Sequence, residues 1–230
     1  MKKKTKIDDG FNSELVETAL FDGELEIPII EDTNPPLPTK VIPFSKRTKS
    51  VDHEEYIVFY ENDIEFGDVL VNPDKYIEEF KLFKGVISLD NSLYIDSPLT
   101  VQIGNVYKSR AIGHYFQTKG INVIPNCRWG DERSYTTSVL LEKFAFLGIP
   151  KHSIVAIGTY GCNQGKEEKH YLREGLIAML DEIEPRCVIV YGSMSPKIFN
   201  EFKSRTTFIR FDDWITSRKR GAQHGYNEIR

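Results

Sequence analysis

Short apolar segments rich in β-branched residues recur along the chain from residue 56 onward. They are separated by stretches of helical character at intervals of roughly thirty residues, the length of a βαβ unit. The segments cover residues 56–60, 85–89, 121–124, 153–157, 187–191 and 207–211. Most lack the alternation of a half-exposed sheet, which indicates strands buried on both faces and paired in parallel. The chain is therefore predicted to be an α/β protein with repeated βα units and a mainly parallel six-stranded sheet.

Repeats of this kind form either an incomplete (β/α) barrel or an open doubly wound sheet. Polar side chains follow nearly every predicted strand. A barrel brings all such positions to one mouth, whereas an open sheet uses chiefly those beside one switch point. The incomplete barrel is therefore favoured, and we expect Asp90, Arg128 and Gly158 to lie at the same edge of the sheet.

The first fifty residues differ in composition from the remainder. They contain two basic patches, at residues 2–6 and 45–50, and the proline-rich breaker 34–38. This pattern predicts a partly extended N-terminal arm over residues 1–50, although the alternating segment 25–30 could also lie as an edge strand. An α/β domain is expected over 51–216 and a basic, polar C-terminal tail over 217–230.

The most informative stretch is 121–133, where an apolar strand closes at Pro125 and gives way to charged and aromatic residues. Residues just past the carboxyl end of a parallel strand face the ligand crevice of α/β proteins. Two arginines on either side of Trp-Gly-Asp suit a phosphate or carboxylate group. The predicted ligand-binding side chains here are Asn126, Arg128, Trp129 and Arg133. The alternative is a solvated loop whose arginines and aspartate pair with one another.

Carboxylates and amides near other strand ends extend this prediction. Asp131 and Asp90 are the candidate catalytic residues, as general base or as ligands of a divalent cation such as Mg²⁺. Gln102 and Asn105 are three residues apart in a helix expected to open at Ser97-Pro98, and they share a face near the same end. Helix capping, turn formation and buried polar packing are the structural alternatives for these four residues.

A glycine-rich segment, residues 158–166, lies between a predicted strand and a predicted helix. Free backbone N–H groups and the positive end of a helix favour an anion at such a place, so Gly158, Thr159 and Gly161 are further candidates for ligand binding. Only three residues separate Gly161 from Gly165, so this is not a Walker loop. A turn selected for tight packing is the alternative.

Composition excludes several classes of protein. The formal net charge of −4 provides no general attraction to nucleic acid, and only the basic run at 218–220, close to Trp214, could contact a phosphate backbone. No apolar run approaches the roughly 18 residues of a membrane span. Three cysteines without Cys-x-x-Cys spacing favour reduced thiols, and hence a cytoplasmic protein.

Several uncommon strings occur in order along the chain: Gly85-Val-Ile-Ser-Leu-Asp-Asn-Ser-Leu-Tyr, Arg110-Ala-Ile-Gly, Val123-Ile-Pro-Asn-Cys-Arg-Trp-Gly-Asp-Glu-Arg, Ile157-Gly-Thr-Tyr-Gly-Cys and Val190-Tyr-Gly. Together they resemble the family catalogued as domain of unknown function 4417, over residues 56 to about 214. The resemblance implies a cytoplasmic protein of a bacterium, phage or other mobile element. It implies no reaction and assigns no role to any residue.

Two functions are compatible with these observations: the first is favoured, and the second is the alternative. The first is an enzyme that acts on a phosphorylated or nucleotide-like substrate bound at the strand carboxyl ends. The second is a non-catalytic protein that sequesters such a ligand or docks on a host or phage protein.

Overall fold

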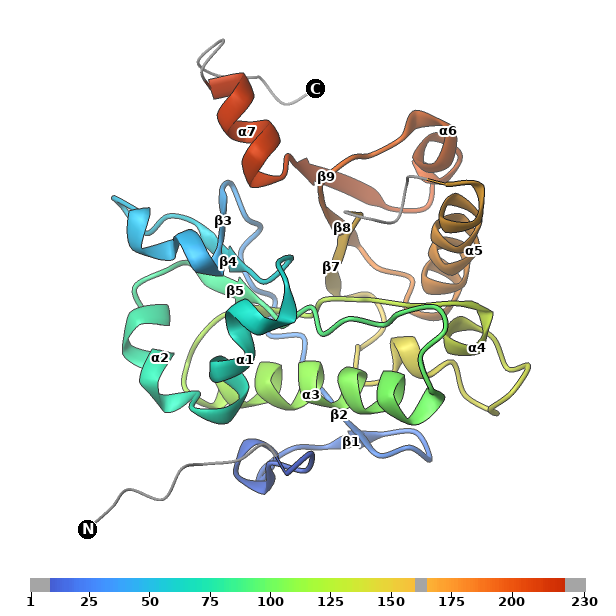
Figure 1. The fold of residues 1–230 in the computed structure, drawn as a ribbon, viewed down its shortest axis with the longest axis horizontal. Helices are drawn as coiled ribbons and strands as arrows, with labels where there is room; N and C mark the ends of the chain where they lie inside the picture. The colour runs from blue at the N-terminus through green and yellow to red at the C-terminus, as the bar shows by residue number, and fades with distance from the viewer. Residues whose placement is uncertain (1–8, 160–164, 222–230) are drawn as a thin grey trace.

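The computed structural model describes residues 9–159 and 165–221, in which the parallel strands form two sheets. The first sheet has the order β3-β4-β5-β6 and the second has the order β7-β8-β9 (Figure 1). The strands are β3 (Val41–Pro43), β4 (Tyr56–Val58), β5 (Gly85–Ile87), β6 (Val123–Ile124), β7 (Ile154–Gly158), β8 (Cys187–Tyr191) and β9 (Thr207–Phe211). An α/β fold with parallel sheets is thereby confirmed.

The single six-stranded sheet of the prediction is replaced by sheets of four and three strands. Between β6 and β7 the ladder is reduced to one parallel bridge, Asn126 with Ala156. The Ala156 N–H donates to the Pro125 carbonyl at 2.9 Å, and the Cys127 N–H donates to the Ala156 carbonyl at 2.7 Å. Pro125 has no N–H of its own, so it cannot donate to extend this ladder. The additional strand, β3, comes from the segment expected to be an arm.

Helices cover the outer face of each sheet (Figure 1). Helices α1 (Asp63–Val71), α2 (Asp74–Phe80) and α3 (Leu99–Thr118) lie against the first sheet, and α5 (Lys166–Glu182) and α6 (Pro196–Phe199) lie against the second. The remaining helices are α4 (Glu132–Tyr135), α7 (Trp214–Gly221) and the 3₁₀ helices η1 (Ser13–Leu15), η2 (Phe44–Lys49), η3 (Phe144–Phe146) and η4 (Asn200–Phe202). No helix within the described ranges is long and apolar enough to cross a membrane.

Strands β4 to β8 are buried on both faces, as their apolar sequences predict, whereas β9, at the edge of its sheet, is half-exposed. All five residues of β8 are buried. Successive side chains point to opposite faces, so Val188 and Val190 contact the cluster beneath α5, whereas Ile189 joins an inner cluster. This inner cluster contains residues of both sheets, among them Val58 and Ile124 from the first.

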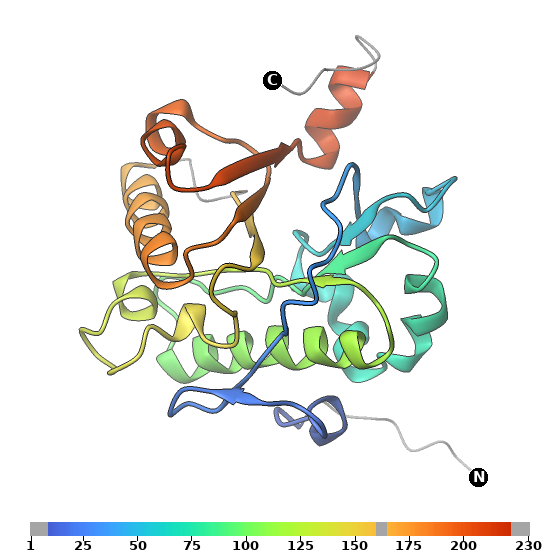
Figure 2. The same ribbon diagram turned by 180° about the vertical axis from the view of Figure 1, so that it is seen from behind.

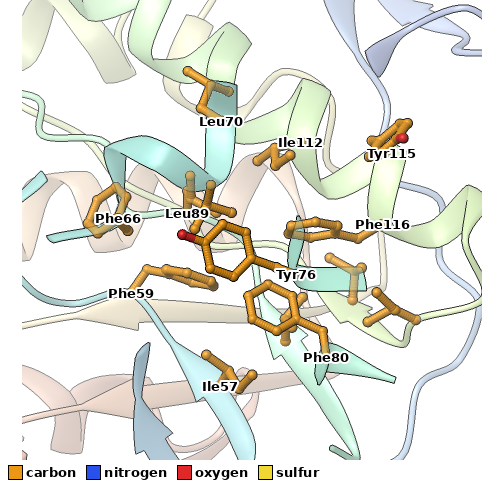
Figure 3. Close-up of a cluster of buried hydrophobic side chains, with 14 of the residues drawn as sticks. Ile57, Phe59, Phe66, Leu70, Tyr76, Phe80, Leu89, Ile112, Tyr115 and Phe116 are labelled. Atoms are coloured by element: carbon orange, nitrogen blue, oxygen red, sulfur yellow. The ribbon is translucent and has the colours of Figure 1, made fainter. Parts of the chain in front are cut away.

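Aromatic rings fill the space between the first sheet and its helices (Figure 3). Phe59, just past β4, packs edge to face with Phe66 of α1 at a centroid distance of 5.7 Å. Phe80 of α2 packs in the same way on Phe116 of α3 at 5.4 Å. All four side chains are buried, so this cluster fixes α1, α2 and α3 against β4 and the rest of the first sheet.

Helix α5 buries an apolar stripe. Leu172, Leu176 and Leu180 recur at every fourth residue and are all buried, and α5 ends at Glu182, before Pro185. Helix α3 begins at Leu99, one residue after the proline expected to open it.

A buried guanidinium joins α3 to the segment after β6. Arg110 is 1% exposed and donates to three backbone carbonyls: Nη1 to Asn126 at 2.7 Å, Nε to Leu147 at 2.9 Å and Nη2 to Ala145 at 3.1 Å. Burial lowers the pKa of Arg110 to about 10, and at neutral pH the side chain stays charged. The three carbonyls therefore replace the water that would hydrate this guanidinium, and the bond to the Asn126 carbonyl fixes the backbone of Asn126.

Much of the predicted N-terminal arm packs with the α/β domain. The short antiparallel pair β1 (Phe21–Asp22) and β2 (Ile27–Pro28) lies beside α3, and Ile27 and Ile30 are buried. The chain then passes along one side of the molecule to β3, which pairs in parallel with β4 (Figure 2). At the other end, α7 continues past residue 217, where the polar tail was expected to begin, and residues 222–230 lie outside the described part.

Replacing Ile30 by Ala should lower the free energy of unfolding by about 2–4 kcal/mol, because the side chain is fully buried against Gly113 of α3. Urea denaturation measures this loss, and Val51→Ala is the control because Val51 is 94% exposed. Gly113→Ala should also destabilise the protein, since the added Cβ would overlap Cδ1 of Ile30. Ile30→Val removes that atom and should recover part of the loss in the double variant. A cost below about 1 kcal/mol for Ile30→Ala would mean that this segment is peripheral to the domain.

Candidate functional site

A pocket of 730 Å³ opens at the carboxyl ends of β5, β6 and β7, within the range of roughly 300–1,000 Å³ typical of small-molecule sites. We name it the strand-end pocket. Its lining residues are Leu93, Tyr94, Ile95, Asp96, Ser97, Pro98, Cys127, Arg128, Trp129, Gly130, Ile157, Gly158, Glu168, Tyr171 and Leu172. Three segments supply most of them: the loop after β5, the turn after β6 and the first turns of α5.

Arg128 is the one cationic side chain among the described lining residues, and it forms an ion pair with a buried carboxylate. Nη1 of Arg128 donates to Oδ2 of Asp90 at 3.0 Å. The Asp90 side chain is 8% exposed and that of Arg128 is 23% exposed, so the ion pair is shielded from water on the aspartate side. Asp90 follows β5 and Arg128 follows β6, and these strands are neighbours in parallel. Asp90 and Arg128 therefore meet at one edge of the first sheet as expected, and Gly158, at the end of β7 in the second sheet, lines the same pocket as Arg128.

Asn126 completes the setting of Asp90. Its Nδ2 donates to Oδ1 of Asp90 at 2.8 Å, and its Oδ1 accepts from the Tyr60 hydroxyl at 3.0 Å. Its backbone N–H donates to Oγ of Ser88 at 2.9 Å. Asn126 thus bonds on all sides to protein groups, and within the described residues it is not part of the pocket lining.

The electrostatics of Asp90 reflect two opposing influences. Burial raises the pKa of its carboxyl, and a smaller contribution in the same direction comes from the Asp63 charge. Arg128 and the hydrogen bond from Asn126 lower this pKa, and the net direction is upward from 3.8. Both Asp90 oxygens accept hydrogen bonds from neighbouring side chains, and the carboxylate contacts the pocket lining through Arg128.

Trp129 forms part of the pocket wall and is fixed by α5. Its indole Nε1 donates to the Tyr171 carbonyl at 2.9 Å, and its ring lies against Gly175. A Cβ at residue 175 would overlap the indole, so glycine is what allows the ring to approach α5 this closely. The ring also packs on Phe146 at a centroid distance of 6.4 Å.

Asp131 and Arg133 pair with each other instead of lining the pocket. Asp131 caps α4, accepting from the Arg133 backbone N–H at 3.0 Å, and its two oxygens accept from Nε and Nη2 of Arg133 at 2.9 and 2.6 Å. Nη2 also donates to the carbonyls of Ile95 and Ser97, at 2.7 and 3.2 Å. Arg133 therefore ties the loop after β5 to α4. This corresponds to the structural alternative for the two residues.

Gln102 and Asn105 also support that loop. Nε2 of Gln102 donates to the Ser97 carbonyl at 3.0 Å, and Nδ2 of Asn105 donates to the Ser92 carbonyl at 2.7 Å. The Gln102 side chain is fully buried and lies against Gly130, where a Cβ would collide with it.

The glycine-rich segment is described only in part. Gly158 lines the pocket, and the ring of Tyr60 lies against it. Thr159 is buried, and its Oγ1 donates to the Ser193 carbonyl at 2.8 Å, which is a packing contact. Gly161 lies outside the described residues. Across 9–159 and 165–221, no three His, Cys, Asp or Glu side chains gather as a metal site would require, and a divalent cation stays a prediction.

Sequence reasoning missed several residues of the site. Tyr60 was assigned only to a strand, although it directly follows the last apolar residue of that run. Tyr94, Glu168 and Tyr171 line the pocket from a loop and from a helix, where no strand-end pattern marks them. Cys127 also lines it, and burial raises the pKa of its thiol to about 12, which leaves the thiol protonated.

Comparison with known proteins identifies one family and two phage relatives. The model of the family described as Domain of unknown function (DUF4417) matches residues 19–212. The Gene 1 protein of Mycobacterium phage L5 is 31% identical over 136 residues, which are 59% of this chain and 56% of that protein. The Gene 1 protein of Mycobacterium phage D29 is 30% identical over 149 residues, or 62% and 53% of the two chains. The chain thus spans about half the length of these curated relatives. No solved structure matches it.

Carboxyl-carbon NMR should show Asp90 titrating above 3.8, whereas Asp68, whose pKa is lowered by hydrogen bonds from Lys75, Tyr76 and Asn72, should titrate at about 2. Because the folded-state pKa of Asp90 is raised, its ionisation costs stability at neutral pH, and this cost disappears as the pH falls through that pKa. As the pH is lowered from neutral to 4, the wild-type protein should therefore gain stability relative to the Asp90→Asn variant. An Asp90 pKa below 3.8 would show that Arg128 outweighs burial.

Proposed function

We infer the function of this chain, which belongs to the DUF4417 family and is related to two phage proteins, from its strand-end pocket. We propose that this pocket binds a small nucleotide-like ligand. Arg128 would bind the anionic group of this ligand. The observation that carries the proposal is that Arg128, bonded to the buried Asp90, lines a pocket of suitable volume at the strand carboxyl ends. Ligands of α/β proteins bind at this edge of the sheet.

The lining favours a ligand with a planar apolar part. Three aromatic residues from three different segments, Trp129, Tyr171 and Tyr94, line the pocket together with leucine and isoleucine residues. Aromatic rings accept nucleobases by stacking. A nucleobase in contact with these rings would leave its phosphate to Arg128, whose planar guanidinium suits phosphate oxygens.

The charges of the lining limit the ligand further. Asp96 and Glu168 also line the pocket, and they would repel a ligand that carries several negative charges. A single phosphate is therefore favoured over a triphosphate. The two carboxylates are suited to accept hydrogen bonds from ribose hydroxyls or from an exocyclic amino group.

We also propose that the two sheets act as one incomplete (β/α) barrel. The bridge between Asn126 and Ala156 connects them, and the inner cluster contains side chains from both. In such an arrangement all strand carboxyl ends face one mouth, which accounts for a pocket built from β5, β6 and β7 together.

Ligand binding without chemistry is the function that this geometry supports best. Asp90 and Asp131 were the candidate catalytic residues, yet both carboxylates bond to arginine and neither lines the pocket within the described residues. We propose that Asp90 positions Arg128 and that Asp131 holds Arg133. A catalytic role for either residue, a protein partner and a cytoplasmic location stay predictions.

Arg128→Lys should weaken binding of a ribonucleoside 5′-monophosphate about ten- to a hundredfold, because lysine cannot reproduce the planar contacts of guanidinium with phosphate. Isothermal titration calorimetry with the four common monophosphates and their nucleosides measures the loss. Nucleoside affinity should change little, since nucleosides lack the group that Arg128 binds.

Arg133→Lys is the matched comparison. This variant should lower the melting temperature, because Arg133 holds Asp131 and two carbonyls, and it should leave monophosphate affinity within about twofold of wild type. Equal losses of affinity in both variants would mean that Arg128 and Arg133 both bind the phosphate, as the sequence predicts, and that Arg128 does not bind it alone. Failure of wild-type protein to bind any of the four monophosphates would sink the proposed function.

A further inference from the structure

We propose that Tyr60 is a positioning residue for Arg128, acting through Asn126 and Asp90, and that it thereby sets the affinity of the strand-end pocket for the phosphate of its ligand. The inference rests on the proposed function for its ligand and on the hydrogen-bond chain for its mechanism. Tyr60 itself is not part of the strand-end pocket lining.

The hydrogen-bond directions in this chain are fixed by Asp90. An ionised carboxylate only accepts, so Nδ2 of Asn126 must face it, and Oδ1 of Asn126 must then face Tyr60. Oδ1 only accepts as well, and the Tyr60 hydroxyl is therefore the donor. Burial raises the pKa of Tyr60 well above its usual value, so this donor keeps its proton at neutral pH.

Tyr60 is held rigidly enough to transmit an orientation. Its ring stacks on Tyr191 with centroids 5.0 Å apart and planes at 17°. Gly158 of β7 also constrains the Tyr60 ring, because the ring carbons occupy the space that a Cβ at residue 158 would need. The Tyr191 hydroxyl in turn accepts from the Trp214 backbone N–H at 3.1 Å.

Loss of the Tyr60 hydroxyl would leave Oδ1 of the buried Asn126 without its donor. The amide could then rotate away from Asp90 to find another partner, and the Asp90 carboxylate would lose the bond at 2.8 Å that fixes its plane. Since Oδ2 of the same carboxylate holds Nη1 of Arg128, the guanidinium would lose its fixed orientation. A preorganised donor binds more tightly than a mobile one because less conformational entropy is lost on binding.

The test compares Tyr60→Phe with Tyr56→Phe. Both tyrosines lie on the same run, four residues apart, and both rings belong to or pack against the inner cluster. Tyr56 is the first residue of β4, at the end opposite the strand carboxyl ends, and its hydroxyl donates to the Pro36 carbonyl at 2.7 Å. Removing this hydroxyl deletes a comparable hydrogen bond that has no link to Arg128. Both variants keep the ring and hence the packing.

Tyr60→Phe should weaken binding of the tightest-binding monophosphate about three- to tenfold, the effect of one hydrogen bond, and should leave binding of the corresponding nucleoside unchanged. Tyr56→Phe should change neither. A general structural effect would lower both affinities together, and an unchanged monophosphate affinity in Tyr60→Phe would overturn the inference.

Side-chain NMR of ¹⁵N-arginine protein provides a measurement that needs no ligand. The Nε–Hε signal of Arg128, assigned by its loss in Arg128→Lys, should exchange faster with water in Tyr60→Phe than in wild type or Tyr56→Phe. Equal exchange rates in all three would overturn the positioning role even if nucleotides bind. Faster exchange in Tyr60→Phe together with no nucleotide binding would uphold the positioning role and reject only the proposed function.

Discussion

The buried carboxylate of Asp90 is the constraint on which the candidate site depends. A charged acceptor shielded from water needs donors, and two side chains that follow the neighbouring strand supply them: Asn126 and Arg128. A buried ion pair of this kind contributes little net stability, because desolvation offsets the attraction. Its effect here is orientation: Arg128 has one favoured placement at the edge of the strand-end pocket, and Asn126 has one favoured amide direction.

Much of the fold follows from local sequence. Most of the apolar runs become parallel strands because they are short, β-branched and buried on both faces, and the leucine stripe of α5 is buried because its spacing matches a helix. The proximity of Asp90 and Arg128 could also be foreseen, since residues after adjacent parallel strands meet at one edge. These predictions succeed where periodicity or strand order alone determines position.

Other parts depend on contacts between distant segments that no pattern records. Strand β3 has three residues and ends in proline, so it resembles a breaker until it pairs with β4. Arg133 resembles a ligand-binding arginine, yet its partners include the carbonyls of Ile95 and Ser97, and a backbone carbonyl leaves no mark in the sequence. Tyr60 is indistinguishable by type from other strand tyrosines until the neighbours of its hydroxyl are known.

The three carbonyls around Arg110 bear on how the chain folds as it is synthesised. Helix α3 carries Arg110, but its partners belong to residues 126, 145 and 147, which are made later. Until residue 147 has been synthesised, the Arg110 guanidinium lacks its full set of acceptors, and burying it would carry an energetic cost. Helix α3 consequently reaches its most stable packing only after the segment between β6 and β7 has been made, although all four strands of the first sheet precede that segment in the chain.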